Sequence, residues 1–221
     1  MYGNEPGREV TFSDDDYRQW LEIAPSPLRE ASILARESGI CRNEILHLRK
    51  DAVDLHDYGD QDDIWGSISV IRGLKRKARK RTLPITRAMA DCLREQMKLS
   101  ECEYVFSSLR DRKEPLSPDT LGIQHTRTME TGEFRPGSGL HALRHTFLSE
   151  AARVTPNVRA LMRIAGHSQI STTMRYVHPE ERDVIAISAT LQRDRQRRDQ
   201  EHAATLVPVH QPSDRLQKPL Q

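Results

Sequence analysis

Residues 140–154 read LHALRHTFLSEAARV, residues 157–166 read NVRALMRIAG and residues 170–178 read ISTTMRYVH. In the two longer segments, apolar residues recur three or four positions apart, which places them on one face of a helix. Gly166 closes the second segment as a glycine C-cap, and Pro179 follows the third. This part of the chain therefore predicts three consecutive helices.

Helix-start signals recur upstream of this stretch. Small polar residues that can cap a helix N-terminus stand at Ser13, Ser26, Thr86 and Ser117. A further short helix is predicted over residues 42–48, and the chain can continue as a helix over residues 180–204. GSISVIRG at residues 66–73 alternates and is rich in β-branched residues, and RKRTLPI at residues 79–85 follows as its hairpin partner. The predicted fold class is α+β, mainly helical, with one small antiparallel sheet.

The length of the chain, 221 residues, corresponds to one large domain or two small ones. We expect an N-terminal stub over residues 1–10, a catalytic or binding domain over residues 11–204, and a mobile, proline-rich tail over residues 205–221.

Several classes of protein do not fit this composition. No apolar run reaches the roughly 18 residues that span a bilayer. The N-terminus MYGNEPGREV has neither the apolar core nor the cleavage site of a secretory signal. The three cysteines Cys41, Cys92 and Cys102 form no CxxC pair and no metal-ligand spacing. The sequence therefore predicts a reduced, cytoplasmic protein.

The net charge of +2 conceals an asymmetry along the chain. Residues 1–63 sum to −8 and residues 64–221 to +10, and no acid occurs between Asp63 and Asp91. The bases of this acid-free stretch include Arg72, Arg76, Lys77, Arg79, Lys80 and Arg81. A run of this kind is typical of a DNA-binding surface, although a solvated charged loop has the same composition.

Three short motifs of the C-terminal half contain chemically capable side chains: HALRH at 141–145, GHS at 166–168 and RYVHP at 175–179. No single one is specific. A histidine metal site is an alternative, because His141, His145, His167 and His178 stand in this region. However, there is no HExxH motif and no carboxylate near the pairs, so we predict no metal and no other cofactor.

The order and spacing of these motifs resemble those of the tyrosine recombinases, the phage integrase and Xer-type family. Its His-x-x-Arg box is followed about 25 residues later by Gly-His, and a nucleophilic tyrosine lies nine residues after that histidine. Here His141 and Arg144 precede Gly166-His167, and Tyr176 lies nine residues beyond His167. GICRNEILHLRKDAVDL at 39–55 resembles the first arginine box, and GLKRKARKRTLPI at 73–85 resembles the β-hairpin that carries the family lysine.

The resemblance implies a catalytic domain in which Tyr176 attacks a DNA phosphodiester, forming a 3′-phosphotyrosyl bond and releasing a 5′-hydroxyl. No ATP is consumed, because the ester conserves the bond energy. Arg144 would clamp the phosphate through its planar fork, and His141 and His167 would donate hydrogen bonds to it or move protons. Lys75 would protonate the leaving oxygen, with Lys77 as the alternative.

One slot departs from the family pattern Gly-x-Arg-x-x-Glu. Gly39 and Glu44 are in register, but Cys41 occupies the arginine position and Arg42 follows one residue later. One residue of helix is a rotation of about 100°, so Arg42 need not point where the family arginine does. Either the backbone presents Arg42, or another base substitutes, or the phosphate has lost one clamp.

The resemblance implies a site-specific DNA recombinase or integrase that acts on double-stranded DNA together with other recombinase protomers, in a tetramer, and without a membrane. Two alternatives remain open at this point. One is a catalytically weakened, DNA-binding relative, and the other is a topoisomerase-like enzyme that relaxes DNA. The family's usual DNA-clasping domain, which precedes the catalytic one, has no counterpart in the residues before position 11.

Overall fold

The computed structural model describes residues 10–70, 80–155, 157–177, 188–198 and 200. Contacts divide the chain into two units, residues 1–177 and residues 178–221. In the second unit, residues 188–198 are helical, as the sequence predicts, whereas the expected boundary at residue 204 lies outside the described residues.

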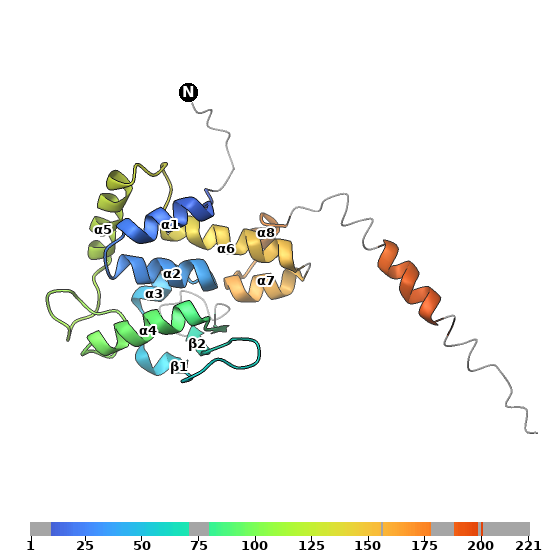
Figure 1. Ribbon diagram of the computed structural model, residues 1–221, viewed down its shortest axis with the longest axis horizontal. Helices are drawn as coiled ribbons and strands as arrows, with labels where there is room; N and C mark the ends of the chain where they lie inside the picture. The colour runs from blue at the N-terminus through green and yellow to red at the C-terminus, as the bar shows by residue number, and fades with distance from the viewer. Residues whose placement is uncertain (1–9, 71–79, 156, 178–187, 199, 201–221) are drawn as a thin grey trace, which may run out of the picture. The chain divides into compact units, whose positions relative to one another are not determined.

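The first unit is mainly helical and contains one small sheet (Figure 1). Its elements in chain order are α1 (Asp14–Ile23), α2 (Leu28–Ser38), α3 (Arg42–Leu46), the 3-10 helix η1 (Lys50–Ala52), β1 (Val53–Leu55), β2 (Gly66–Val70), β3 (Arg81–Pro84), α4 (Arg87–Leu99), α5 (Pro118–Thr131), α6 (Leu140–Val154), α7 (Val158–Ala165) and α8 (Ile170–Met174). The predicted fold class is confirmed.

Most of the predicted caps are present. The hydroxyl of Ser13 accepts a hydrogen bond from the Asp16 N–H at 3.1 Å, and Thr86 and Ser117 cap α4 and α5 in the same way. The prediction for Ser26 is wrong, because α2 begins at Leu28 without a side-chain cap. The Ser26 hydroxyl instead accepts a hydrogen bond from the Gln96 side chain at 3.3 Å.

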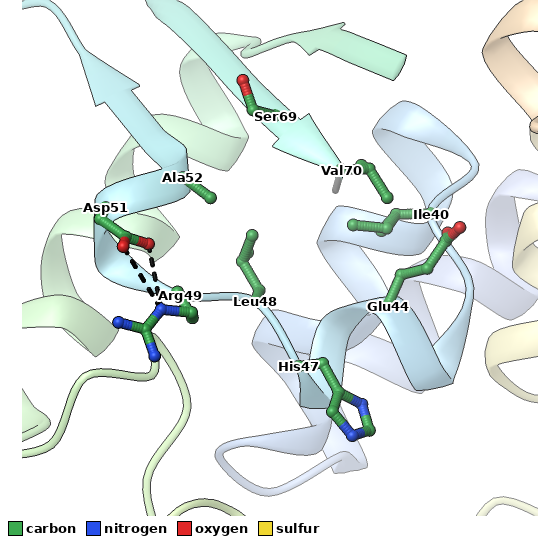
Figure 2. A pocket seen from close by; sticks show the side chains of 9 residues that line it. All are labelled: Ile40, Glu44, His47, Leu48, Arg49, Asp51, Ala52, Ser69 and Val70. Carbon is green, nitrogen blue, oxygen red and sulfur yellow. Dashed lines mark hydrogen bonds and ion pairs between the residues drawn. The ribbon is translucent and has the colours of Figure 1, made fainter. Parts of the chain in front are cut away.

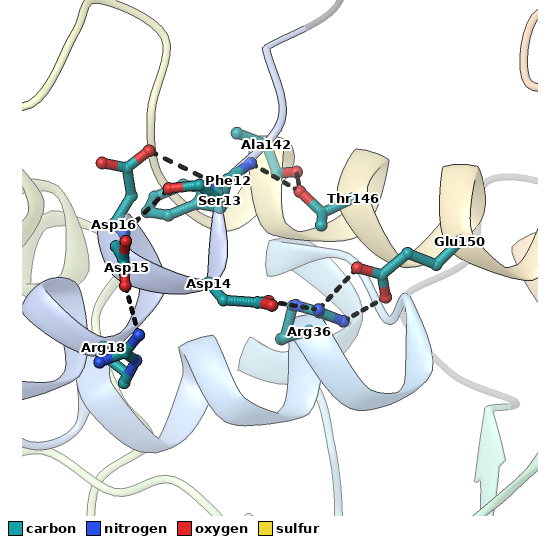
Figure 3. Close-up of polar contacts among 10 residues, drawn as sticks. All are labelled: Phe12, Ser13, Asp14, Asp15, Asp16, Arg18, Arg36, Ala142, Thr146 and Glu150. Atoms are coloured by element: carbon teal, nitrogen blue, oxygen red, sulfur yellow. Dashed lines mark hydrogen bonds and ion pairs between the residues drawn. The ribbon is translucent and has the colours of Figure 1, made fainter.

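Helix α2 is the centre of the first unit. It packs against α6 on one side and α4 on the other, and it also contacts α1, α3 and α5 (Figure 1). Leu28, Leu34 and Ala35 of this helix are fully buried. Polar contacts hold α2 to α6 as well, because Arg36 donates two hydrogen bonds of 2.7 Å to Glu150 (Figure 3).

The N-terminal segment is tied to the same helix α6. The backbone N–H of Phe12 donates to the Thr146 hydroxyl at 2.8 Å (Figure 3), and the Phe12 ring packs edge-on against Trp20. Both aromatic rings are buried. The chain is therefore packed onto α6 from residue 12 onward, two residues after the end of the expected stub.

The sheet has three strands in the order β1-β2-β3, all antiparallel. The predicted hairpin of β2 and β3 is confirmed, with Ile68 opposite Leu83. Strand β1 was not predicted, because three residues are too few for a period of two to be visible. It forms through pairing, with Val53 opposite Ile68. Among the residues that the structure describes, no helix is both long and apolar enough to span a bilayer.

Candidate active site

Helix α6 presents the His-x-x-Arg box. Spacings of three and four residues put His141, Arg144 and His145 on one side of the helix. The Arg144 guanidinium is buried and donates hydrogen bonds to the backbone carbonyls of Gly39 and Ala165. These carbonyls lie at the ends of α2 and α7, so Arg144 joins three helices at one point.

The positive charge of Arg144 lies in the protein interior, away from water. Burial lowers the pKa of its guanidinium, and the nearby positive charge of Arg81 lowers it further. The interactions with Cys41, Glu44 and Tyr176 act in the opposite direction. Because a guanidinium is not deprotonated in proteins, the group still presents a cation.

The turn after α7 aims His167 at this cation. Gly166 adopts the left-handed conformation with φ of 67°, and the His167 N–H donates to the Met162 carbonyl at 3.0 Å. The His167 ring hydrogen-bonds through Nδ1 to the Thr173 hydroxyl at 3.0 Å, and its Nε2 lies 3.4 Å from an Arg144 nitrogen. Both ring nitrogens therefore have fixed neighbours.

Tyr176 completes the cluster from the end of α8. Its side chain belongs to a small second core with Leu148 and Ala165, and it is 9% exposed. Its ring stacks on that of His167, with centroids 6.3 Å apart. The phenolic oxygen is hydrogen-bonded to Nδ1 of His145. The predicted residues Arg144, His167 and Tyr176 are thus brought together.

His141 lies at the edge of this cluster. It is exposed, and its ring meets the His145 ring edge-on with centroids 4.2 Å apart. From the sequence, His145 was considered only within the motif HALRH and in the rejected metal site, and it was assigned no role in the recombinase chemistry. The signal that could have singled it out is its position four residues after His141 and directly after Arg144.

A buried ion pair lies beside this cluster. Arg81 of β3 donates two hydrogen bonds to the Glu44 carboxylate, at 2.8 and 2.9 Å, and its Nε donates to the Ile164 carbonyl at 2.8 Å. Burial by itself raises the pKa of Glu44, but the hydrogen bonds and charge of Arg81 outweigh it, so the pKa is lowered. A Cβ at Gly166 would lie 2.7 Å from an Arg81 nitrogen, so this glycine allows the close approach.

The expectation that Arg81 belongs to an exposed DNA-binding run is corrected by its position. Its side chain is 1% exposed, because alternate residues of β3 face the interior and Glu44 neutralises the charge there. Lys80, the preceding residue, is exposed. The remaining predicted bases, Arg72, Lys75, Arg76, Lys77 and Arg79, lie outside the described residues.

The neighbouring residues Cys41 and Arg42 point in different directions. Cys41 is the N-cap of α3, its N–H donates to Glu44 at 3.0 Å, and its thiol interacts electrostatically with Arg144. Burial and the charge of Glu44 raise the pKa of this thiol. Arg42 is exposed and donates to the Pro118 carbonyl at the start of α5. Cys41 thus faces the cluster, and Arg42 does not.

A separate pocket adjoins α3 (Figure 2). Its lining comes from α3, η1 and β2 and includes Leu48, Asp51 and Val70. It shares Glu44 with the ion pair, but its lining contains neither Arg144 nor Tyr176. Within the described ranges, no group of three histidine, cysteine or acidic side chains could hold a metal ion.

A tyrosine hydroxyl among one buried arginine and two histidines, on this helical scaffold, defines the catalytic domain of a tyrosine recombinase. Residues 11–182 match the model of the phage integrase family, and the chain belongs to that family.

The curated relatives are recombinases. The tyrosine recombinase XerA of Thermococcus kodakarensis is 30% identical over 171 residues, which cover 73% of this chain and 55% of XerA. XerC of Pseudomonas fluorescens is 28% identical over 148 residues, covering 64% of this chain and 44% of XerC. The chain thus spans about half the length of these relatives.

Solved structures share the fold. The Tn1549 transposon integrase in complex with circular intermediate DNA matches with a TM-score of 0.66 and 16% identity, over 85% of this chain and 68% of that one. XerH bound to its difH substrate matches with a TM-score of 0.62 and 17% identity, over 86% and 56% of the two chains.

Proposed function

We propose that this chain is the catalytic part of a site-specific DNA recombinase that cleaves and rejoins DNA through a 3′-phosphotyrosyl intermediate. The observation that carries the proposal is the placement of the Tyr176 hydroxyl beside a buried cation, Arg144, with His167 stacked on the same ring. Membership of the phage integrase family and the relatedness to Xer recombinases support the same activity.

The proposed chemistry is a transesterification. The Tyr176 oxygen attacks the phosphorus, the 5′-oxygen leaves, and negative charge develops on the non-bridging phosphate oxygens. Arg144 and His167 are donors held in place before the reaction, and fixed donors of this kind stabilise such charge without reorganisation. His141 is exposed at the edge of the cluster, and we assign it a hydrogen bond to the phosphate. Lys75 remains the proposed acid for the leaving oxygen.

Double-stranded DNA is the proposed substrate, and other recombinase protomers are the proposed partners. The Tn1549 integrase and XerH structures contain DNA, and a λ integrase dimer is bound to a core site. The basic excess of residues 64–221 fits a polyanionic substrate. We also propose that the protein works in the cytoplasm, where cysteines such as its three remain reduced. We propose the boundaries at residues 11 and 204 for its catalytic domain.

The proposal is tested with nicked suicide duplexes, in which the released 5′ fragment diffuses away and traps the covalent adduct. A pool of such duplexes is drawn from the DNA that flanks the gene. We expect a labelled strand to comigrate with the protein in a denaturing gel, and Tyr176→Phe to abolish that band while leaving DNA binding intact. The matched control is Tyr58→Phe, since Tyr58 is 77% exposed. DNA binding without any adduct, or an adduct formed by Tyr176→Phe, would refute the proposal.

A further inference from the structure

His145 contacts Tyr176, but the proposed reaction assigns no role to this histidine. Nδ1 of His145 is hydrogen-bonded to the phenolic oxygen, and the ring centroids are 5.6 Å apart. The two residues are 8% and 9% exposed, so bulk water has little access to the contact. His145 lies in the middle of the 15-residue helix α6, and its position relative to Arg144 is therefore fixed by the backbone.

The Tyr176 hydroxyl has both a proton acceptor and a cation among its neighbours. The neutral imidazole can accept the phenolic proton at Nδ1. Arg144 interacts electrostatically with Tyr176, and a nearby positive charge favours the phenolate. A general base must be hydrogen-bonded to its nucleophile, and the surroundings must stabilise the negative charge that develops on the nucleophile. His145 and Arg144 meet these two requirements for Tyr176.

The charged and titratable groups around this pair come from three places. His141 and Arg144 lie on α6, His167 stacks on the Tyr176 ring from the turn after α7, and Arg175 precedes Tyr176 and is exposed. The two arginines are cationic at neutral pH. His141 and His167 carry the same imidazole group as His145. An experiment must therefore separate the effect of His145 from that of His141.

We propose that His145, through Nδ1, takes the proton of the Tyr176 hydroxyl as the tyrosine attacks DNA. The proposal rests on the proposed function. As the Tyr176 O–H bond breaks, an N–H bond forms on His145 and the phenolic oxygen bonds to phosphorus. The bond from phosphorus to the 5′-oxygen breaks, and that oxygen leaves with the electron pair and is protonated by the acid assigned to Lys75. In rejoining, the 5′-hydroxyl attacks phosphorus and gives its proton to the base form of Lys75. The bond from phosphorus to the phenolic oxygen breaks, and the His145 imidazolium returns its proton to that oxygen.

The decisive variant is His145→Asn, whose side-chain oxygen can replace Nδ1 as a hydrogen-bond acceptor but cannot hold the proton. We expect single-turnover cleavage at pH 7 to fall by about 10²-fold or more. The wild-type rate should rise with pH as the base loses its proton, and then level off. In the variant this inflection should be lost, and the rate should rise about tenfold per pH unit. His56→Asn, in an exposed loop, is the control with an unchanged profile.

A second substrate separates the two proton transfers. With sulfur in place of the bridging 5′-oxygen, the leaving thiolate needs no proton. Lys75→Ala should then regain its rate, whereas His145→Asn should remain slow. His141→Asn, measured in parallel, should keep the inflection. If the sulfur substrate restores His145→Asn, if the inflection follows His141 instead, or if His145→Asn cleaves faster than wild type, the assignment of the base is wrong.

Folding and the proposed function are monitored independently. Thermal unfolding of His145→Asn reports on the fold, and His145→Ala should regain cleavage when imidazole is added to the buffer, which a folding defect would not allow. A failure of imidazole to restore any cleavage in a folded His145→Ala variant counts against the base. If wild type forms no adduct on any duplex, the proposed function itself fails, and this inference fails with it.

Discussion

Replacing Glu44 by glutamine should destabilise the protein strongly, because it leaves the Arg81 guanidinium buried without its counter-charge. The two side chains are 3% and 1% exposed and share two hydrogen bonds. Removing one partner of such a pair costs about 3–5 kcal/mol. With a urea m-value of about 2 kcal/mol/M, a loss of about 4 kcal/mol lowers the unfolding midpoint by about 2 M.

The chain offers a matched control for this substitution. Glu150 accepts two hydrogen bonds of 2.7 Å from Arg36, the same number as in the buried pair, but its side chain is 43% exposed. Exposed pairs contribute about 0–1 kcal/mol, so Glu150→Gln should shift the urea midpoint by about 0.5 M or less. Equal shifts for the two variants would refute the argument that burial sets the cost.

The pH dependence provides a second check on the same pair. The pKa of Glu44 is lowered in the folded protein, so the ionised carboxylate stabilises the fold. This contribution is fully present above the pKa of an unfolded glutamate, about 4.3, and is lost as the pH falls through the lower folded value. The stability gap between wild type and Glu44→Gln, measured in urea, should therefore shrink below about pH 4. A stability difference between wild type and Glu44→Gln that stays constant down to pH 3 would show that the ionised Glu44 carboxylate does not stabilise the fold.

Three further predictions concern the arginine slot, the turn after α7 and the basic run. Cys41→Arg should speed adduct formation by about 10²-fold, because position 41 faces Arg144. Arg42→Ala should change the rate of adduct formation less than twofold. The reverse pattern would mean that Arg42 is the second arginine that binds the phosphate. Gly166→Ala should lower the urea midpoint, because the residue has φ of 67° and its Cβ would meet Arg81; an unchanged midpoint would mean that the turn relaxes freely. The log–log salt slope of DNA binding should flatten by about 0.9 for each phosphate that the protein no longer neutralises, and an unchanged slope would mean that the basic run is only a solvated loop. The alanine substitutions for that measurement are at Arg76, Arg79 and Lys80.

Local interactions account for what the sequence alone determined. The hydroxyls of Ser13, Thr86 and Ser117 accept hydrogen bonds from N–H groups two or three residues away. A few consecutive residues are therefore enough to predict where these helices begin. The left-handed glycines that end α2 and α7 are local in the same sense. The spacing from His167 to Tyr176 spans one turn and one short helix. Together with the His-x-x-Arg box and the upstream motifs, it carried the resemblance to the family.

Tertiary packing decided the rest. Strand β1 exists because it pairs with β2, and no pattern within its three residues marks it. Arg81 resembles its basic neighbours in the sequence, yet Glu44, 37 residues earlier, makes it an interior residue. His145 meets Tyr176 across 31 positions. Cys41 likewise interacts with Arg144, which lies on another helix. In each case the free energy of the side chain is set by burial and by a charge or hydrogen-bond partner distant in sequence, which only the folded chain brings into contact.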